Sequence, residues 1–222
     1  MISALACLAA CGAKPPPDPG RPQLDRAVCA PGAGGFSTTI DNPFLPLPVG
    51  RTAVLQGSED GAIVRVEIRA LDETEVVAGV TTRVVEERET EDDQLVEVSR
   101  NFLVQAADGT VCYYGEDVDI YQGGAVVAHE GQWRAGVAGA EAGILMPGTP
   151  ALDQWYRQEH APGIAEDRAE HVAVGETVTV PAGTFTDTVR AREWSPLESG
   201  TSTKIYGRGI GMLVDNAVER QP

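Results

Sequence analysis

The fold of this chain is decided near its C-terminus, in a stretch that begins Gly175-Glu-Thr-Val-Thr-Val-Pro-Ala-Gly-Thr-Phe185 and runs to Val214. Two strand-like runs meet across Pro181-Ala-Gly183, and a third follows the turn Ser195-Pro-Leu-Glu-Ser-Gly200. Proline and glycine at each reversal, between runs rich in valine, threonine and aromatic residues, are typical of consecutive antiparallel strands. The stretch therefore predicts a β-meander.

The same pattern extends towards the N-terminus. Between Ala62 and Leu71, apolar and charged residues alternate, which is the period of a half-buried strand. The runs Val80 to Thr90 and Leu95 to Val104 repeat the pattern across an acidic turn. A large twisted sheet has to curl or close to protect its edges. We therefore expect an all-β fold with minor α content, in which about ten to eleven strands form an antiparallel meander curled into a barrel or half-barrel.

Two segments are less regular. Ala135 to Pro150 is rich in glycine and proline and is expected to form a long loop. Periodicity does not decide between strand and helix for Ile164 to Val174, where the run Glu-Asp-Arg-Ala-Glu would also suit a helical turn.

Charge is the strongest compositional feature of the 222 residues. The chain has 17 lysines and arginines against 33 aspartates and glutamates, a net charge of −16 at pH 7. Such a surface repels phosphates, so nucleic acid is not an expected partner. A well-hydrated acidic surface is the simplest interpretation, and binding of a cation by carboxylates is the alternative.

The N-terminus has the features of a bacterial lipoprotein precursor. Residues 1–10 form a short apolar segment of the kind found in signal peptides. Leu8-Ala9-Ala10-Cys11, followed by Gly12, resembles a lipobox. The resemblance implies that Cys11 becomes the first residue and carries palmitate or a related acyl chain. The protein is then expected to be extracytoplasmic and anchored to the cell membrane or, as Gly12 allows, to the outer membrane.

Residues 11–35 contain Pro15-Pro-Pro-Asp-Pro-Gly20 and Ala30-Pro-Gly-Ala-Gly-Gly35. A segment of this composition buries little apolar surface, so a tether is expected that spans about 25 Å as a flexible coil. Residues 36–222 are then a single β-domain.

Once Cys11 is lipidated, Cys29 and Cys112 are the cysteines of the mature chain. In an oxidising compartment they are a possible disulfide, and two independent thiols are the alternative.

The quoted C-terminal motifs, Val-Pro-Ala-Gly-Thr-Phe185, Glu193-Trp-Ser-Pro-Leu-Glu198 and Tyr206-Gly-Arg-Gly-Ile-Gly211, resemble those of a group of uncharacterised bacterial secreted proteins and lipoproteins. The resemblance covers roughly residues 40 to 218 and implies no activity. More loosely, the hairpin and the strand after it are similar to half-barrel periplasmic proteins, including lipoprotein carriers. That likeness implies a fold only.

No catalytic signature is present: there is no Gly-x-Ser-x-Gly, and His129-Glu130 lacks the second histidine of a zinc-protease helix. One acidic cluster forms a candidate ligand or cation site. Its carboxylates suit Ca²⁺, and a pair of them with one raised pKa would suit general acid–base work. Exposed side chains are the alternative, because charge runs usually lie in solvent. The carboxylates of this site are Glu116, Asp117, Glu159, Glu166 and Asp167.

Trp155 and Tyr206 complete the candidate site, since aromatic side chains can contact an apolar ligand in a concavity. Their alternative role is to fill the core. The sequence thus predicts a lipid-anchored extracytoplasmic β-domain that binds a small ligand or a cell-envelope partner. No cofactor is expected apart from Ca²⁺. The alternative is a metal-dependent or carboxylate-based enzyme that uses Glu159, Glu166 and Asp167.

Overall fold

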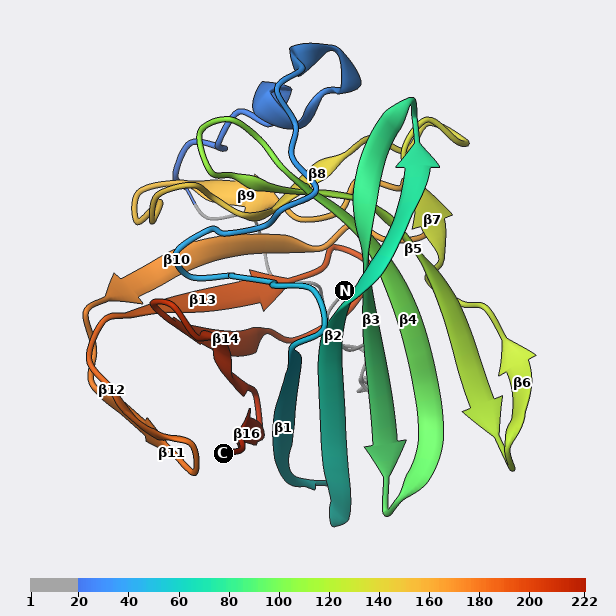
Figure 1. The fold of residues 1–222 in the computed structure, drawn as a ribbon, viewed down its shortest axis with the longest axis vertical. Helices are drawn as coiled ribbons and strands as arrows, with labels where there is room; N and C mark the ends of the chain where they lie inside the picture. The colour runs from blue at the N-terminus through green and yellow to red at the C-terminus, as the bar shows by residue number, and fades with distance from the viewer. Residues whose placement is uncertain (1–19) are drawn as a thin grey trace.

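The computed structural model describes residues 20–222, so the expected signal segment 1–10 and the lipidation site Cys11 lie outside the described residues. Nearly all regular structure is β (Figure 1). The strands are β1 (Thr52–Glu59), β2 (Ala62–Val77), β3 (Val80–Glu91), β4 (Gln94–Gln105), β5 (Val111–Gln122), β6 (Ala125–Ala128), β7 (Trp133–Arg134), β8 (Gly143–Met146), β9 (Trp155–Arg157), β10 (Arg168–Val174), β11 (Val178–Val180), β12 (Gly183–Phe185), β13 (Thr188–Trp194), β14 (Ser202–Gly207), β15 (Gly211–Asp215) and β16 (Val218–Arg220). Two short 3-10 helices, η1 (Ala27–Cys29) and η2 (Pro31–Ala33), precede them.

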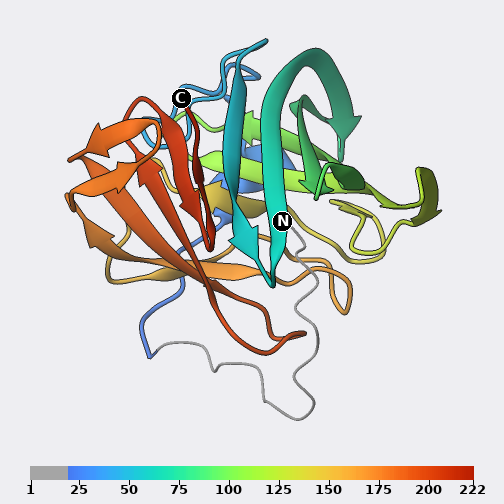
Figure 2. The same cartoon turned by 90° about the horizontal axis from the view of Figure 1, so that it is seen from below.

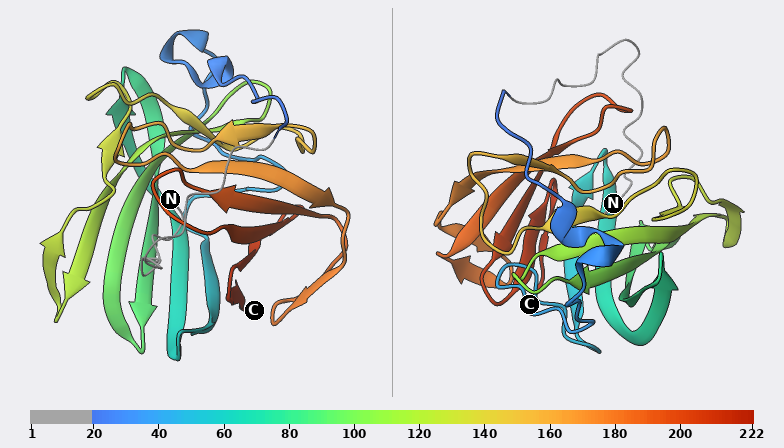
Figure 3. Two further views of the ribbon diagram at one scale, coloured as in Figure 1. Left: turned by 180° about the vertical axis from the view of Figure 1, so that it is seen from behind. Right: turned by 90° about the horizontal axis from the view of Figure 1, so that it is seen from above.

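Within residues 20–222, 14 strands form one sheet in the order β6-β5-β4-β3-β2-β1-β16-β15-β14-β13-β10-β9, with β7 and β8 also paired to β5. β11 and β12 form a separate hairpin. The sheet curls so that β10, β13 and β14 face β1 to β5, as Figure 2 and the rear view in Figure 3 show. It does not close, since β6 and β9 end the ladder. The predicted antiparallel meander with a curled, half-barrel form is confirmed.

Tight turns explain why neighbours in sequence are neighbours in the sheet. Asp60 and Gly61 join β1 to β2 with φ angles of 50° and 92°. Ala78 and Gly79 join β2 to β3 with 50° and 79°. Positive φ at both central residues gives the turn the right-handed twist of the strands that it connects. These hairpins fix the register of the strands β1 to β3.

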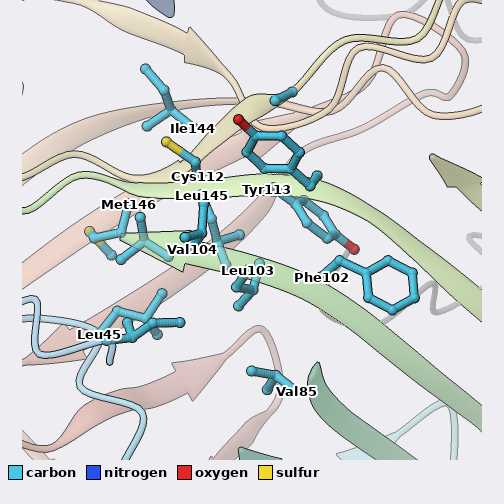
Figure 4. Close-up of a cluster of buried hydrophobic side chains, with 14 of the residues drawn as sticks. Leu45, Val85, Phe102, Leu103, Val104, Cys112, Tyr113, Ile144, Leu145 and Met146 are labelled. Carbon is cyan, nitrogen blue, oxygen red and sulfur yellow. The ribbon is translucent and has the colours of Figure 1, made fainter. Parts of the chain in front are cut away.

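The apolar core lies mainly inside the curl. The alternation in β2 places Val64, Val66 and Ile68 on the buried face, as predicted. Residues from β4, β5 and β8, together with Leu45 and Val85, form the part of the core that Figure 4 shows. All four residues of β8 are buried.

The part of the expected tether that the structure describes is not a free linker. Cys29 is fully buried and forms a disulfide with Cys112 of β5, with 5.5 Å between their Cα atoms. The backbone N–H of Leu24 donates to the carbonyl of Trp155 at 2.7 Å. The hydroxyl of Tyr114 donates to the carbonyl of Cys29 at 2.7 Å. Residues 20–35 therefore pack against β5 and β9, at the top of Figure 1.

The irregular segments are also more ordered than the sequence predicts. The expected loop from Ala135 to Pro150 contains β8, where Gly143 lies so close to the carbonyl of Gln158 that a Cβ atom would come within 2.1 Å. β5 runs through Gly115, whose φ of 133° and closeness to Trp133 exclude a side chain. The ambiguous segment Ile164 to Val174 contributes strand β10. Along residues 20–222, no helix has the length and apolar character needed to span a bilayer.

Candidate functional site

A cavity of about 420 Å³ opens between β3, β4 and β5 on one side and the segments around residues 159–167 and 195–198 on the other. None of its lining residues in the described chain is a lysine or arginine. Its acidic lining residues are Glu89, Glu91, Glu97, Glu130, Glu159, Asp167 and Glu198. Its apolar lining residues are Val96, Ile120, Ile164, Ala165 and Leu197.

Two other spaces are less suited to a ligand. One of about 40 Å³, beside Glu87, holds little more than a few water molecules. The other, of about 430 Å³, lies beside η1 and η2 and is lined largely by alanines. Its arginine, Arg26, forms an ion pair with Glu141, so their charges offset each other. The acidic cavity is therefore the strongest candidate site.

The register of the sheet explains why carboxylates face this cavity. Side chains alternate between the two faces of a strand, so Glu89 and Glu91 of β3 share the inner face. Glu97 of β4 lies directly opposite Glu89, and Ile120 of β5 lies opposite Glu97. Like charges directly opposite each other oppose strand pairing. The fold thus tolerates an acidic inner wall at some cost in stability.

Glu116 continues that wall towards the interior. It is four residues before Ile120 on β5, so its side chain points to the same face, opposite Asn101 of β4. It is 0% exposed, and neither of its carboxylate oxygens has a hydrogen-bond partner among the described residues. Burial raises the pKa of Glu116 above its usual range and Glu159 raises it further, while the nearby Tyr113 hydroxyl lowers it.

The opposite wall carries a second pair of acids. The backbone N–H groups of Gln158 and Glu159 donate to the carbonyl of Asp167 at 2.8 Å and 3.1 Å, which holds the two segments together. Burial raises the pKa of Asp167, and the charge of Glu159 raises it further. On β4, burial and then the charge of Glu89 raise the pKa of Glu97 to about 7. The cavity therefore keeps a share of its carboxyl groups protonated near neutral pH.

Elsewhere in the interior, two buried acids lie beside a cationic side chain of the protein. The ammonium of Lys204 lies 3.0 Å from an oxygen of Glu193 and 3.7 Å from an oxygen of Asp215. Burial alone would lower the pKa of Lys204, but Asp215 and Glu193 hold it well above its usual range. The side-chain amide of Gln158 donates to Glu193 at 2.8 Å. We call Lys204, Glu193 and Asp215 the lysine cluster.

The structure places some of the predicted site residues at the cavity and the others away from it. Glu159 and Asp167 line the cavity, and Glu116 lies behind the lining, on the same face of β5 as the lining residue Ile120. Tyr206 is buried beside the lysine cluster, where burial and then the charge of Glu193 raise its pKa.

Three others are turned away from the cavity. Asp117 accepts two hydrogen bonds from Arg134, at 3.1 Å and 2.6 Å. Trp155 packs against Trp194, with 6.1 Å between ring centroids. Glu166 lies 4.0 Å from Arg157 and 3.9 Å from Arg168.

Sequence reasoning missed the strand residues of the wall, above all Glu89, Glu91 and Glu97. A signal was present, because Glu87 and Glu89 stand two positions apart in the predicted strand Val80 to Thr90, and Glu91 follows at the same interval in the predicted turn. Alternation alone does not say which face is inside, and acids are normally assigned to solvent. Here the acidic face of β3 lies inside the curl.

The arrangement concentrates negative charge around one cavity, which favours a cationic ligand. In residues 20–222, no group of three or more histidine, cysteine, aspartate or glutamate side chains is arranged to hold a metal ion. The carboxylates are spread around the wall instead. No protein-family model, curated protein or solved structure matches the chain.

Proposed function

We propose that this protein is a ligand-binding domain held outside the cytoplasm by a lipid on Cys11, and that it takes a small molecule into the acidic cavity. The observation that carries the proposal is a cavity of about 420 Å³ walled by carboxylates and by apolar side chains. Its volume falls in the range of small-molecule sites, which are concave and combine apolar lining with a few placed polar groups. A binding role also agrees with the absence of a catalytic motif from the sequence.

The location outside the cytoplasm is supported by two separate features. The Leu-Ala-Ala-Cys11 sequence has the pattern on which lipoproteins are acylated. The disulfide between Cys29 and Cys112 is a bond that persists in oxidising compartments. Either the cell membrane or the outer membrane suits this anchoring.

A thermal-shift screen tests ligand binding. A library with cationic, neutral and anionic small molecules is added to the wild-type domain and to two variants. Ile120→Trp fills the cavity, whereas Val126→Trp adds the same bulk at an exposed position on β6. We expect ligands that raise the melting temperature of wild type and Val126→Trp but not of Ile120→Trp. Equal shifts in all three proteins, or none from any compound, would contradict the proposal.

Lipid attachment is tested separately in a bacterial host. Metabolic labelling with an alkynyl palmitate analogue is expected to mark the full-length chain, and Cys11→Ala is expected to abolish the label. Labelling that persists in Cys11→Ala would show that the anchor is assigned to the wrong residue. An unlabelled wild type would remove the anchor from the proposal.

A second candidate function is a carboxylate-based enzyme. The observation in its favour is that Asp167 and Glu159 face one cavity and that Asp167 has a raised pKa, as a general acid requires. Glu166, the third acid proposed from the sequence, is held outside by arginines. Turnover of a ligand from the screen, lost in Glu159→Gln and Asp167→Asn while binding is kept, would establish catalysis. Recovery of the unchanged ligand would leave binding alone.

A further inference from the structure

Resting on that proposed function, we propose that the ligand is an organic cation, an ammonium or guanidinium group on an apolar body. The cationic group is seated against Glu116 and its neighbouring acids, and the apolar body lies between the aliphatic side chains at the mouth of the cavity.

The first argument is the state of Glu116. Its carboxylate is fully buried, and neither oxygen has a hydrogen-bond partner within bonding distance in the described chain. It lies behind the cavity lining, on the face of β5 from which Ile120 enters that lining, and it interacts with the lining acids Glu97 and Glu159. Buried polar groups are normally hydrogen-bonded, and a buried carboxylate normally has a counter-charge. The acidic side chains that raise its pKa after burial are Glu159 and Glu97, and both belong to the cavity lining. An ammonium or guanidinium supplies both the missing donors and the missing charge.

The second argument separates an organic cation from a metal ion. Ca²⁺ needs six to eight oxygens at about 2.3–2.6 Å around one point. The described residues contain no such convergent group, and the carboxylates lie along walls of a space of about 420 Å³ instead. That volume suits a molecule of several heavy atoms, with donors that reach more than one carboxylate.

The third argument comes from the mouth of the cavity. Ile164 and Leu197 line it and are 50% and 46% exposed. Val96 and Ile120 extend the same apolar lining from β4 and β5. Exposed aliphatic side chains beside an acidic interior suit a ligand whose charged end enters first and whose apolar part remains near the opening.

Binding of a cation is expected to release protons. Glu97 faces Glu89; Glu116 faces Glu159, Glu97 and the Tyr113 hydroxyl. Asp167 faces Glu159, Glu193 and the Ser195 hydroxyl. Since burial and like charges keep part of these carboxyls protonated, an incoming cation favours the ionised form and drives protons into solvent. Affinity is therefore expected to rise as the pH increases from 6 to 8.

Titration calorimetry with matched six-carbon probes tests the proposal. n-Hexylammonium, 1-hexanol and hexanoate share an alkyl chain and differ in charge, and CaCl2 serves as the inorganic cation. We expect n-hexylammonium to bind most tightly. Its heat at pH 7 is expected to differ between Tris and phosphate buffers, because released protons are taken up by the buffer.

Single substitutions test which acidic side chain binds the cationic group of the probe. Glu116→Gln keeps the shape of the side chain and is expected to weaken n-hexylammonium binding by about tenfold or more. Glu97→Gln provides a second, independent test if Glu116→Gln does not fold. Glu219→Gln removes an exposed acid far from the cavity lining and is expected to bind as wild type does.

Three outcomes would overturn the cation assignment. Binding of 1-hexanol or hexanoate in preference to n-hexylammonium, abolished by Ile120→Trp, would leave the proposed binding function standing with a different ligand class. Binding of Ca²⁺ alone, lost in Glu116→Gln, would replace the organic cation with a metal ion. Absence of binding by all four probes would remove the organic cation, and the library screen would then decide the binding function by itself.

Discussion

The interior of this protein contains two groups of buried acids that differ in one respect. In the lysine cluster, Glu193 and Asp215 lie within 4 Å of the ammonium of Lys204. Along the cavity wall, Glu97 and Glu116 lie among other acids, and the cavity lining contributes no lysine or arginine in the described chain. The fold supplies a cation to the first group. In the second, burial and neighbouring acids raise the pKa values of the carboxyl groups.

The comparison separates buried acids that have a structural role from buried acids that have a functional role. Acids that the chain itself neutralises need no further partner, and their role is to hold strands together. Unneutralised acids cost stability, because desolvation penalises their charged forms. A fold that keeps them in an open cavity is better explained by a ligand than by stability.

The largest effect is expected from removal of the cation in the lysine cluster. Lys204→Met leaves Glu193 and Asp215 buried without their counter-charge, which is expected to lower the free energy of unfolding by about 3–5 kcal/mol. Denaturant unfolding at pH 7.5 measures it. Arg65→Met is the control, because Arg65 and its partner Glu67 are partly exposed and such pairs contribute about 1 kcal/mol or less. Similar losses in both variants would contradict the distinction.

A smaller effect is expected from pH in the wild-type protein. The pKa of Glu97 is raised from 4.5 to about 7 and that of Asp167 from 3.8 to about 7, chiefly by burial. The folded state therefore holds more protons than the unfolded state near neutral pH. The free energy of unfolding should fall by about 1–2 kcal/mol or more between pH 6.5 and 8.5.

The lower limit of this pH range is chosen because of His171, whose pKa is shifted in the direction opposite to that of the carboxyl groups. Burial lowers the pKa of His171 to about 4, so its contribution to stability is complete above pH 6.5 and is lost below it. Denaturant unfolding at several pH values from 6.5 to 8.5 thus isolates the carboxyls. A flat or rising stability across that range would contradict the account of the wall.

The smallest effect is expected in single variants of the wall. Glu97→Gln removes one proton-binding group, so the decline in stability between pH 6.5 and 8.5 should shrink by about 1 kcal/mol. Glu219→Gln, at an exposed position of β16, should leave the decline unchanged. Equal slopes in Glu97→Gln and wild type would show that Glu97 does not titrate near neutral pH.

Much of the fold follows from the sequence. The alternation in β2 and the glycine-containing turns specify consecutive hairpins, and a sheet of that size has to curl. The sequence does not predict strand β8 or the packing of residues 20–35 against the sheet. Both depend on distant contacts, Gly143 with Gln158 and Cys29 with Cys112, that no local pattern encodes.

The candidate site is predictable only in part. Glu116, Glu159 and Asp167 were found as carboxylates near one another, but Asp117 and Glu166 have arginine partners that only the structure shows. The wall residues Glu89 and Glu97 were missed because alternation gives two faces without saying which one is enclosed. That choice is made by the curl of the whole sheet.

The most direct test of the central claim is a carbon-13 NMR titration of the side-chain carboxyls in the ligand-free domain, with Glu97→Gln and Glu116→Gln for assignment. The account predicts that Glu97 titrates with a pKa of about 7 and that the pKa of Glu116 lies above the range of ordinary glutamates. It also predicts that n-hexylammonium lowers both pKa values. Titration of both groups at the pKa of about 4.3 typical of an exposed glutamate would contradict the claim that burial and neighbouring acids raise the pKa values of this wall.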